Sequence, residues 1–416
     1  MSQKYSVVIA GGGHAAAEAA VALRSQGYAG SIVLIGEEPT LPYARPPLSK
    51  GYQKGDVESE ALPLRPSSFY ERQQIDLRLG VRVEHIDRSH RRVRTSTDEW
   101  VEYESLILAL GGRARRLGAP VVDGASNVCY LRSLSDAAQL KGRLARGGHL
   151  LVIGAGYIGL ELAATARHLG AGVTVVESAP RVLARVTSPV VSRFFDRVHR
   201  EEGVDIRLQA GLEDLDHSAD GSVTSARLAD GTQIVVDAMV VGIGLVPNVQ
   251  LATEAGLATD DGVLVDGQCR TSDPAIFAIG DCSRHPDPIY GTLRRLESVP
   301  NAVEHARMAA AAICGRGANY DATPWFWSDQ YDVRLKTVGI MRATDTVIVR
   351  GNPDVGRSFS AFYLRDGIVA AADVLSSAKD FAAARALVSG RVAVAPDLLA
   401  NVDLPMKDLV SNGARR

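Results

Sequence analysis

The chain has 416 residues, of which 46% are apolar and 23% charged, and its net charge at pH 7 is −2. This length predicts two or three domains, and the composition is typical of a water-soluble globular protein. No apolar stretch reaches the roughly 18 residues that span a bilayer, and the N-terminus lacks the apolar core of a secretory signal, so we expect a cytoplasmic protein. The near-neutral charge argues against a protein that binds nucleic acid or an anionic membrane through a basic field.

One structural unit occurs twice. Each copy has a β-branched run, a glycine cluster, an alanine-rich amphipathic stretch and a second β-branched run that ends in an acidic residue. The first copy reads YSVVIAGGGHAAAEAAVALRSQG and then SIVLIGEE, and the second reads HLLVIGAGYIGLELAATARHLG and then GVTVVESAP. The order strand, helix, strand predicts a parallel sheet with a right-handed crossover, so the fold class is α/β.

The first copy carries a dinucleotide fingerprint at Gly11, Gly13 and Ala16. In this pattern the first glycine makes the tight turn and the second lets the backbone approach a pyrophosphate. A helix that begins near His14 would direct its unpaired amides at the phosphates. Glu37 closes the next strand 24 residues after Gly13, where its carboxylate can accept hydrogen bonds from a ribose.

Residues 81–110 predict short strands around the sequence RSHRRVRTSTDEW, which we interpret as a solvated hairpin face, and they end in the buried-looking run SLILAL. The second copy then matches the full fingerprint with Gly154, Gly156 and Gly159. Glu177 follows Gly156 by 21 residues. An acid at this place repels a 2′-phosphate and predicts NADH over NADPH, while Arg181 and Arg185 downstream could offset part of the repulsion.

From about residue 204 a further alternating stretch leads to DAMVVGIG, and TSDPAIFAIGDCS then precedes the helix-like segment NAVEHARMAAAAICG. From about Pro324 the chain changes to aromatic-bearing strands followed by alanine-rich helices, which indicates a third, small domain.

A single fingerprint is weak evidence for a nucleotide site, but two copies with two correctly placed acids predict two cofactors. We expect FAD in the first site and NADH in the second, because a flavin relays electrons from a nicotinamide.

The four cysteines are widely scattered at Cys129, Cys269, Cys282 and Cys314, without the paired spacing of a redox disulfide or a zinc site. The segment 38–52, which follows the first acidic strand end, also has no cysteine. We therefore expect no metal site and no sulfur relay. Electrons should leave the flavin directly and one at a time, which suits a one-electron protein acceptor.

Several longer stretches resemble the flavin-dependent ferredoxin reductases that serve bacterial monooxygenase and ring-hydroxylating dioxygenase systems. The resemblance covers nearly the whole chain, and its most specific stretches are LPYARPPLSKGY at 41–52, GAGYIGLELAA at 154–164, TSDPAIFAIGDCS at 271–283, RLESVPNA at 295–302 and PWFWSDQYD at 324–332. It implies an FAD domain at 1–112 and 246–323, an inserted NADH domain at 113–245 and a C-terminal α+β interface domain at 324–416. The two nucleotide domains would be Rossmann-like.

The resemblance also implies the residues that hold each cofactor. For FAD they are Gly11, Gly13, Ala15 and Ala16 at the pyrophosphate, Glu37 at the ribose, Val83 and Arg132 on the adenine and phosphate side, Lys50 beside the ring, Asp281 at the ribityl chain, Val299 at the ring edge, and Arg45. For NADH they are Gly154, Gly156, Tyr157, Ile158, Gly159, Glu177, Arg185, Gly242 and Gly244. One departure is that Ala109, Leu110 and Gly111 stand where the family has Ala-Thr-Gly, so a threonine hydroxyl is lost.

Three residues are predicted to act near the reacting rings. Lys50 is a suitable cation beside a reduced flavin, and Glu161 on the second fingerprint helix is a candidate ion-pair partner for it, because an unpaired buried lysine is costly. Trp325 and Trp327 would lie on one face of a strand. We interpret Trp325 as core, and the resemblance implies that Trp327 lies against the flavin and nicotinamide.

The acceptor expected from the resemblance is an acidic two-iron ferredoxin that docks on a local basic surface. The candidate docking residues near the predicted ring edge are Arg294, Arg295 and Arg307, and the resemblance adds Lys407. The alternatives are a flavoprotein that reduces a small molecule such as oxygen, a quinone or a radical, and a flavoprotein that serves as a signalling or DNA-binding partner. The sequence leaves a monomer and a homodimer both open.

Overall fold

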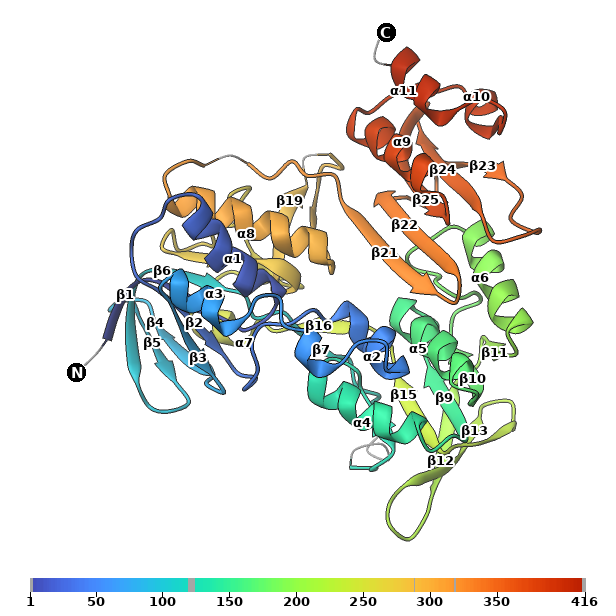
Figure 1. Ribbon diagram of the computed structural model, residues 1–416, viewed down its shortest axis with the longest axis horizontal. Coiled ribbons are helices and arrows are strands. Elements are labelled where there is room, and N and C mark those ends of the chain that lie inside the picture. The colour runs from blue at the N-terminus through green and yellow to red at the C-terminus, as the bar shows by residue number, and fades with distance from the viewer. Residues whose placement is uncertain (1–2, 119–123, 288, 318, 414–416) are drawn as a thin grey trace. The chain divides into compact units, whose positions relative to one another are not determined.

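The computed structural model describes residues 3–118, 124–287, 289–317 and 319–413 (Figure 1). The chain divides into two compact units. The first comprises Met1–Ala44, Ser59–Arg113 and Leu245–Ala322, and the second comprises Arg45–Glu58, Ala114–Gly244 and Thr323–Arg416. Within the described part of the chain, no helix combines the length and apolarity needed to cross a bilayer.

The first unit is built on a sheet with the strand order β3-β2-β1-β6-β5-β4, and β18 also pairs with β6. These strands are β1 (Gln3–Ala10), β2 (Ile32–Gly36), β3 (Ile75–Leu79), β4 (Val83–Asp87), β5 (Arg92–Thr95), β6 (Trp100–Leu108) and β18 (Ile276–Ala278). β1 runs parallel to β2 and β6, as the first copy of the repeated unit predicts. The antiparallel pairs β4–β5 and β5–β6 form the predicted arginine-rich hairpins.

Two alanine-rich helices pack together in this unit, α1 (His14–Ser25) and α8 (Val299–Ile313). Their buried alanines share one core with β1 and β2, since small side chains let helix backbones approach closely. α8 is the predicted long helix, and it begins after the N-cap Ser298. The smaller elements are α3 (Ser67–Arg72), α7 (Gln250–Glu254), β16 (Leu245–Pro247), β17 (Val263–Leu264), β19 (Ser283–Asp287), β20 (Thr292–Arg294), η2 (Ser59–Ala61) and η4 (Gly280–Cys282).

The second unit contains the second copy of the repeat in a parallel sheet of order β11-β10-β9-β15-β8. Its strands are β8 (Val128–Cys129), β9 (His149–Ile153), β10 (Gly172–Glu177), β11 (Asp205–Leu208) and β15 (Ala238–Val241), with a separate antiparallel sheet of β12 (Leu212–His217), β13 (Val223–Leu228) and β14 (Gln233–Val235). Its helices are α2 (Gly51–Lys54), α4 (Leu134–Leu144), α5 (Tyr157–His168) and α6 (Pro189–Glu201), and η1 (Pro46–Ser49) precedes α2. β7 (Gly112–Ala114), of which Gly112 and Arg113 belong to the first unit, pairs with β16 of that unit.

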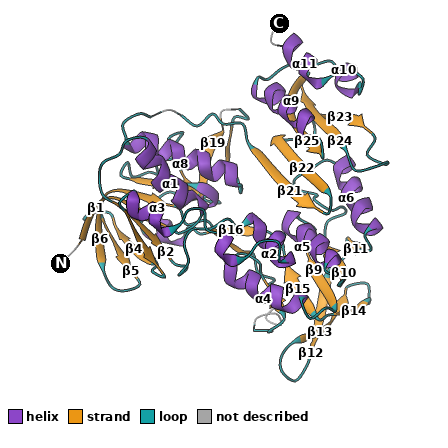
Figure 2. Cartoon of the chain, viewed as in Figure 1, coloured by secondary structure: helices purple, strands orange, loops and turns teal. Residues whose placement is uncertain are grey.

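The last part of the second unit is an antiparallel sheet of order β21-β22-β25-β24-β23 followed by helices (Figure 2). Its elements are β21 (Trp325–Gln330), β22 (Val333–Gly339), β23 (Thr346–Gly351), β24 (Phe359–Arg365), β25 (Ile368–Leu375), α9 (Ala378–Ser389), α10 (Pro396–Ala400) and α11 (Met406–Gly413). The predicted order of aromatic strands and then helices is therefore confirmed.

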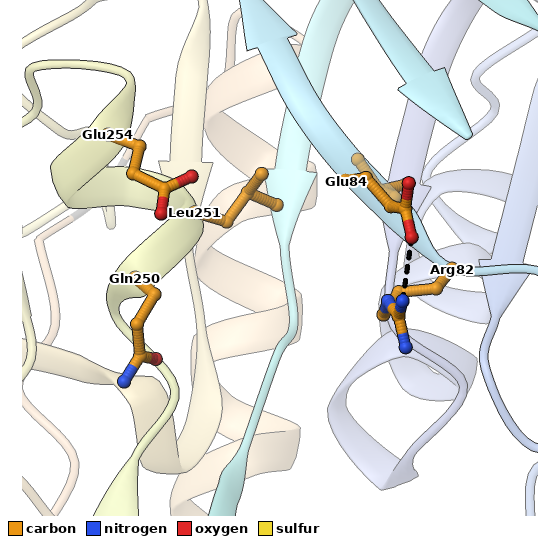
Figure 3. Close-up of a pocket in the computed structure, with 6 residues that line it drawn as sticks. Arg82, Glu84, Gln250, Leu251 and Glu254 are labelled. Carbon is orange, nitrogen blue, oxygen red and sulfur yellow. Dashed lines mark hydrogen bonds and ion pairs between the residues drawn. The ribbon is translucent and has the colours of Figure 1, made fainter. Parts of the chain in front are cut away.

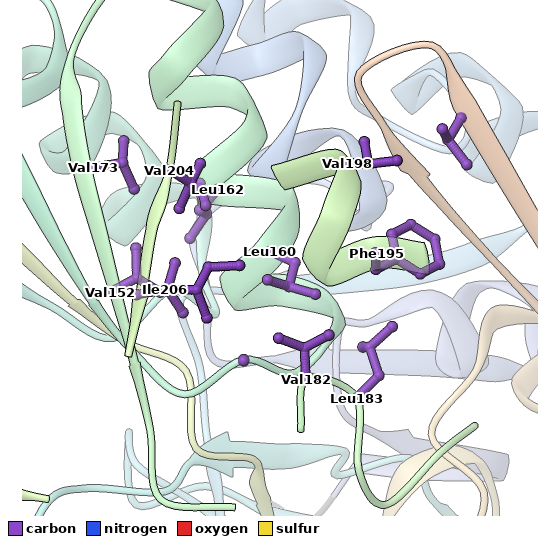
Figure 4. Packing of buried hydrophobic residues seen from close by; sticks show 14 of the residues in the cluster. Val152, Leu160, Leu162, Val173, Val182, Leu183, Phe195, Val198, Val204 and Ile206 are labelled. Carbon is purple, nitrogen blue, oxygen red and sulfur yellow. The ribbon is translucent and has the colours of Figure 1, made fainter. Parts of the chain in front are cut away.

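One hydrophobic core joins this C-terminal sheet to the parallel sheet of the same unit. It combines Leu160 of α5 and Phe195 of α6 with Leu335, Phe359 and Tyr363 of the C-terminal strands. Figure 4 shows how side chains of α5, α6 and the segment at Val182 converge at this core. One continuous hydrophobic core therefore supports both the parallel sheet and the C-terminal sheet of the second unit.

The same interior encloses an acid. Asp373 on β25 is buried and accepts hydrogen bonds from Tyr363 Oη at 2.6 Å and from the Thr187 hydroxyl. Burial raises the pKa of Asp373 to about 6, although the two hydrogen bonds act in the opposite direction. Because the folded state holds this proton more tightly than an unfolded chain does, the proton stabilises the fold at low pH, and the stabilisation is lost as the pH rises through about 6.

We predict that Asp373→Asn removes this pH dependence. Between pH 4 and pH 7 the unfolding free energy of the parent should fall relative to that of the variant by on the order of 3 kcal/mol, which corresponds to the rise in the Asp373 pKa. Denaturant unfolding of both proteins at several pH values measures this difference, and contributions of other groups cancel in the comparison. Parallel stability curves would show that Asp373 titrates normally.

Candidate functional site

The first glycine turn has the shape of a phosphate-binding loop. Gly11 has φ +128°, and a Cβ added there would meet the carbonyl oxygen of Ala109 at 2.2 Å, so only glycine fits. A Cβ added at Gly13 would meet no atom within 4 Å, which leaves open space in front of the turn. Gly13 is also the N-cap of α1, and no side chain caps the helix. The first amides of α1, including those of Ala15 and Ala16, therefore face a space that an anionic phosphate can fill.

Two further predicted FAD residues lie on segments that meet this turn. A Cβ added at Gly280 would lie 3.0 Å from Cβ of Ala15, so η4 passes directly beside the start of α1. Asp281 is the next residue on η4. Val299 is the first residue of α8, which packs against both η4 and α1. The residues that the sequence assigns to the pyrophosphate, the ribityl chain and the ring edge thus belong to three adjacent elements.

The predicted ribose acid, Glu37, directly follows β2 and is exposed. Its carboxylate pairs with Arg82 Nη1 at 3.1 Å, a partner that sequence reasoning missed. Arg82 also lines a pocket of about 280 Å³ together with Val83, Glu84, Gln250, Leu251 and Glu254 (Figure 3). This pocket adjoins the predicted adenine contact Val83, but its lining residues do not include Lys50, Glu161 or Trp327, so we do not place the chemistry there.

The second glycine turn has the same backbone geometry as the first. Gly154 has φ +100°, and a Cβ there would meet the carbonyl oxygen of Gly242 at 2.6 Å, while a Cβ at Gly159 would meet that of Gly154 at 2.1 Å. Gly156 is the N-cap of α5 without a side-chain cap, and a Cβ there would meet only one atom, at 3.9 Å. The predicted residue Gly242 therefore lies against the fingerprint, and the face at Gly156 is open.

The other predicted NADH residues surround this turn. Glu177 Oε2 accepts the Ala155 amide at 2.8 Å and Oε1 accepts the Ala179 amide at 2.8 Å, which fixes the carboxylate at the end of β10. A Cβ added at Gly244 would lie 3.5 Å from Arg185 Nη2, so these two predicted residues are neighbours. Of the first two residues of α5, Ile158 is exposed, while Tyr157 packs against Phe326 with ring centroids 4.7 Å apart and ring planes tilted by 38°.

The predicted pairing of Lys50 with Glu161 is confirmed. Lys50 Nζ lies 2.7 Å from Glu161 Oε2, and the side chains are 18% and 1% exposed. Two hydroxyls that sequence reasoning missed complete the site: Ser49 Oγ donates to Oε2 at 2.5 Å and Ser328 Oγ donates to Oε1 at 2.7 Å. Such a buried carboxylate is stable only because a cation and two donors compensate its charge.

Segment 45–58 explains how Lys50 reaches Glu161. Ser49 O accepts the Thr165 hydroxyl at 2.9 Å, and Gln53 Nε2 donates to the carbonyl of Ala137 at 3.0 Å, so the segment is bonded to both α5 and α4. Arg45 Nη1 donates to the carbonyl of Arg132 at 2.5 Å, which brings these two predicted FAD residues together. Arg45, Lys50 and Arg132 therefore belong to the second unit, whereas the glycine turn of Gly11 and Gly13 belongs to the first.

The two tryptophans of β21 lie on one face, as their spacing predicts. The ring centroids of Trp325 and Trp327 are 5.6 Å apart. Trp325 packs against the C-terminal core, which confirms its interpretation as a core residue. Trp327 is half-buried on the strand that also carries Ser328.

The cysteines do not form a redox relay. All four lie in the described part of the chain as free thiols, and Cys129, Cys269 and Cys282 are buried. Burial raises the pKa of Cys282 to about 11 and that of Cys129 to about 12, which keeps both protonated and poorly nucleophilic. Among the described residues, no group of three or more His, Cys, Asp and Glu side chains could hold a metal ion.

The predicted docking residues differ in how available they are. Arg295 is largely buried and pairs with Glu297 at 2.6 Å, and Arg294 pairs with Asp287 at 3.3 Å. Arg307 is 59% exposed, with one pairing to Glu304 on the same helix, and Lys407 is exposed on α11. Arg307 and Lys407 are therefore the candidates with charge left for a partner.

Comparison with known proteins agrees with this geometry. Residues 5–306 match the family model described as pyridine nucleotide-disulphide oxidoreductase, and residues 325–410 match the reductase C-terminal model. The chain is 42% identical to putidaredoxin reductase of Pseudomonas putida, with 99% of this chain and 98% of that protein covered. It is 43% identical to rhodocoxin reductase of Rhodococcus erythropolis, with coverages of 97% and 93%.

A solved structure gives the same result for the fold. The crystal structure of the covalent putidaredoxin reductase–putidaredoxin complex matches with a TM-score of 0.96 at 41% identity, and 99% of each chain is covered. The predicted fold class, with two Rossmann-like nucleotide-binding regions and a C-terminal α+β region, is confirmed, and FAD and NAD(H) are the cofactors of this fold. The chain belongs to the pyridine nucleotide-disulphide oxidoreductase family, within its group of flavin-dependent ferredoxin reductases.

Proposed function

We propose that this protein is a cytoplasmic NADH-dependent reductase of an acidic two-iron ferredoxin that feeds a monooxygenase or a ring-hydroxylating dioxygenase. The observation that carries the proposal is the combination of two open, uncapped glycine turns with the buried Lys50–Glu161 pair in a chain whose described thiols form no relay. Donor and acceptor of electrons must then exchange them through the bound cofactors and not through sulfur.

The residues present fit FAD and NADH. Gly11, Gly13, Ala15 and Ala16 would hold the FAD pyrophosphate through backbone amides, and Asp281 and Val299 lie on the elements that meet this turn. When bound, FAD accepts a hydride from NADH and passes electrons on one at a time. We assign 1–112 and 246–323 to FAD, 113–245 to NADH and 324–416 to the interface domain.

The second turn favours NADH. Gly154, Gly156 and Gly159 would receive the pyrophosphate, with Gly242 behind the turn. The Glu177 carboxylate is fixed by two backbone amides at the end of β10, so it cannot easily turn away from a 2′-phosphate. Arg185 beside Gly244 supplies a positive charge on the same site, which moderates the preference.

Lys50, Glu161 and Trp327 would act where the rings meet. Lys50 supplies a positive charge that Glu161 keeps in place at 2.7 Å in a site from which water is largely excluded. A preorganised charge in such a site acts more strongly than one in water and needs no reorganisation during the reaction. Trp327, which is half-buried next to Ser328, would supply an apolar surface for a ring.

Glycine substitutions should separate binding from folding. Gly156→Ala places its Cβ in open space, so the melting temperature should change little while NADH binds at least tenfold more weakly, because the methyl group obstructs the pyrophosphate. Gly159→Ala, whose Cβ meets a carbonyl at 2.1 Å, should lower the melting temperature as well. Titration with NADH and thermal scans of both variants measure this. Unchanged NADH affinity in Gly156→Ala would contradict the assignment of this turn.

Glu161→Ala should slow the reduction of bound flavin by NADH more than it weakens FAD retention. The substitution leaves Lys50 without its carboxylate, and a loss of about tenfold or more in the stopped-flow rate is expected for a buried charge pair. FAD content after gel filtration gives the retention. Unchanged reduction kinetics would refute a role for the pair.

Ferredoxin reduction should depend on charge, whereas ferricyanide reduction should not. The rate of ferredoxin reduction by NADH should fall with added salt and fall severalfold in Arg307→Glu, because opposite charges steer the two proteins together. Arg227→Glu, an equal charge change at a 50% exposed arginine of β13, serves as the control. Equal losses with both acceptors would remove the docking role of Arg307, and ferredoxin that stays oxidised while oxygen or a quinone is reduced would replace the proposed function.

A further inference from the structure

A row of buried polar side chains continues from Glu161 into the C-terminal sheet. Ser328 Oγ, which contacts Glu161 Oε1, lies 3.2 Å from Gln330 Nε2. Gln330 Oε1 lies 2.8 Å from His199 Nε2, and His199 Nδ1 lies 3.2 Å from Tyr331 Oη. Ser328, Gln330 and His199 are each 0–1% exposed. The row therefore has little water to satisfy it and must satisfy itself.

Only one arrangement of protons satisfies the whole row. The carboxylate of Glu161 can only accept, so Ser328 donates to it, and the Ser328 oxygen then accepts from the Gln330 amide. The Gln330 carbonyl must accept from His199 Nε2–H. Burial lowers the pKa of His199 to about 4, so the ring is neutral and its Nδ1 accepts from Tyr331. Every donor in the row points toward Glu161.

We propose that Ser328, Gln330, His199 and Tyr331 form a one-directional hydrogen-bond chain that positions Glu161 and, through it, the Lys50 ammonium. The proposal rests on the proposed function, in which this ion pair serves hydride transfer. Because Ser49 and Lys50 both contact Oε2, Ser328 is the donor that holds Oε1. Hydrogen bonds in such a chain polarise one another, so the last donor binds the carboxylate more strongly than an isolated serine would.

The chain also links elements that are distant in sequence. It joins α5, which carries Glu161, to β21 with Ser328 and Gln330 and to α6 with His199. Serine and glutamate are 167 residues apart. The C-terminal sheet thereby contributes to the position of Lys50 without contacting the lysine itself, and the four residues act as positioning residues.

The test measures how firmly Lys50 is held. In the FAD-loaded protein without NADH, acylation of Lys50 by acetic anhydride is followed by peptide mass spectrometry. Ser328→Ala removes the donor to Oε1, so the ammonium should leave its carboxylate more often, and the labelling rate should rise about tenfold, the effect of one hydrogen bond to a charged group. Tyr331→Phe, which contacts neither Glu161 nor Lys50 in the chain, should give a smaller rise.

Ser360→Ala is the matched control, because Ser360 is also buried on the C-terminal sheet and its hydroxyl also contacts a carboxylate, that of Asp380 at 3.3 Å. Its Lys50 labelling should equal that of the parent. Glu161→Gln should raise labelling, and adding Ser328→Ala to it should raise it no further, since the two residues act on one pair. Labelling that does not change in Ser328→Ala, that rises equally in Ser360→Ala, or that adds fully in the double variant overturns the proposal.

A kinetic readout separates the proposal from the proposed function. Ser328→Ala should lower the rate constant of flavin reduction about tenfold, with a smaller change in the dissociation constant of NADH and no loss of FAD. If the parent protein fails to reduce a ferredoxin, the proposed function fails while the labelling result still decides the positioning role. If ferredoxin is reduced and Lys50 labelling is insensitive to Ser328, only the positioning role fails.

Discussion

Glu161 carries a negative charge into an interior where its side chain is 1% exposed, and removing a carboxylate from water costs several kcal/mol unless its charge is compensated. The compensation comes from three side chains on two segments of the chain: Ser49 and Lys50 before α2, and Ser328 on β21. Segment 45–58 therefore belongs with the second unit although the sequence on both sides of it builds the first. The ion pair with Glu161 is thus one of the contacts, together with those to Thr165 and Ala137, that bind this segment to the second unit.

The glycine turns impose a different constraint, because each turn needs glycines for two separate reasons. At Gly11, Gly154 and Gly159 the chain approaches itself so closely that a side chain would collide with a carbonyl oxygen. At Gly13 and Gly156 the opposite holds, since each begins an uncapped helix and has open space beside it. The glycines that lie against a carbonyl oxygen shape each turn, and the glycines with open space beside them leave room for a phosphate.

Local sequence patterns predict much of the fold and of the candidate site. Both repeats, the acids at Glu37 and Glu177, the C-terminal strands and the Lys50–Glu161 pair follow from spacing, strand ends and a motif resemblance, which are properties of short stretches of sequence. Ser328, Gln330 and His199 were missed because their role depends on pairings across more than 100 residues, and buried serine and glutamine look in a sequence like surface residues. Arg82 was missed for a similar reason, since its pairing with Glu37 joins two strand ends 45 residues apart.

The buried thiols and the buried ion pair both bear on the route by which electrons can leave the protein. Cys282 follows Asp281 on η4 but donates to the carbonyls of Ile279 and Leu108, and burial holds its pKa near 11, so it behaves as a small core residue. The chain therefore keeps the nucleotide-binding turns of a family named for disulphide chemistry, but its buried thiols offer no route for electron transfer. What remains is the fixed charge of Lys50 held by Glu161, and under the proposed function this charge would stabilise negative charge without forming a covalent bond. Such a site is suited to an acceptor that takes electrons without bonding to the protein, which is the reason to place an iron–sulfur partner at the end of the pathway.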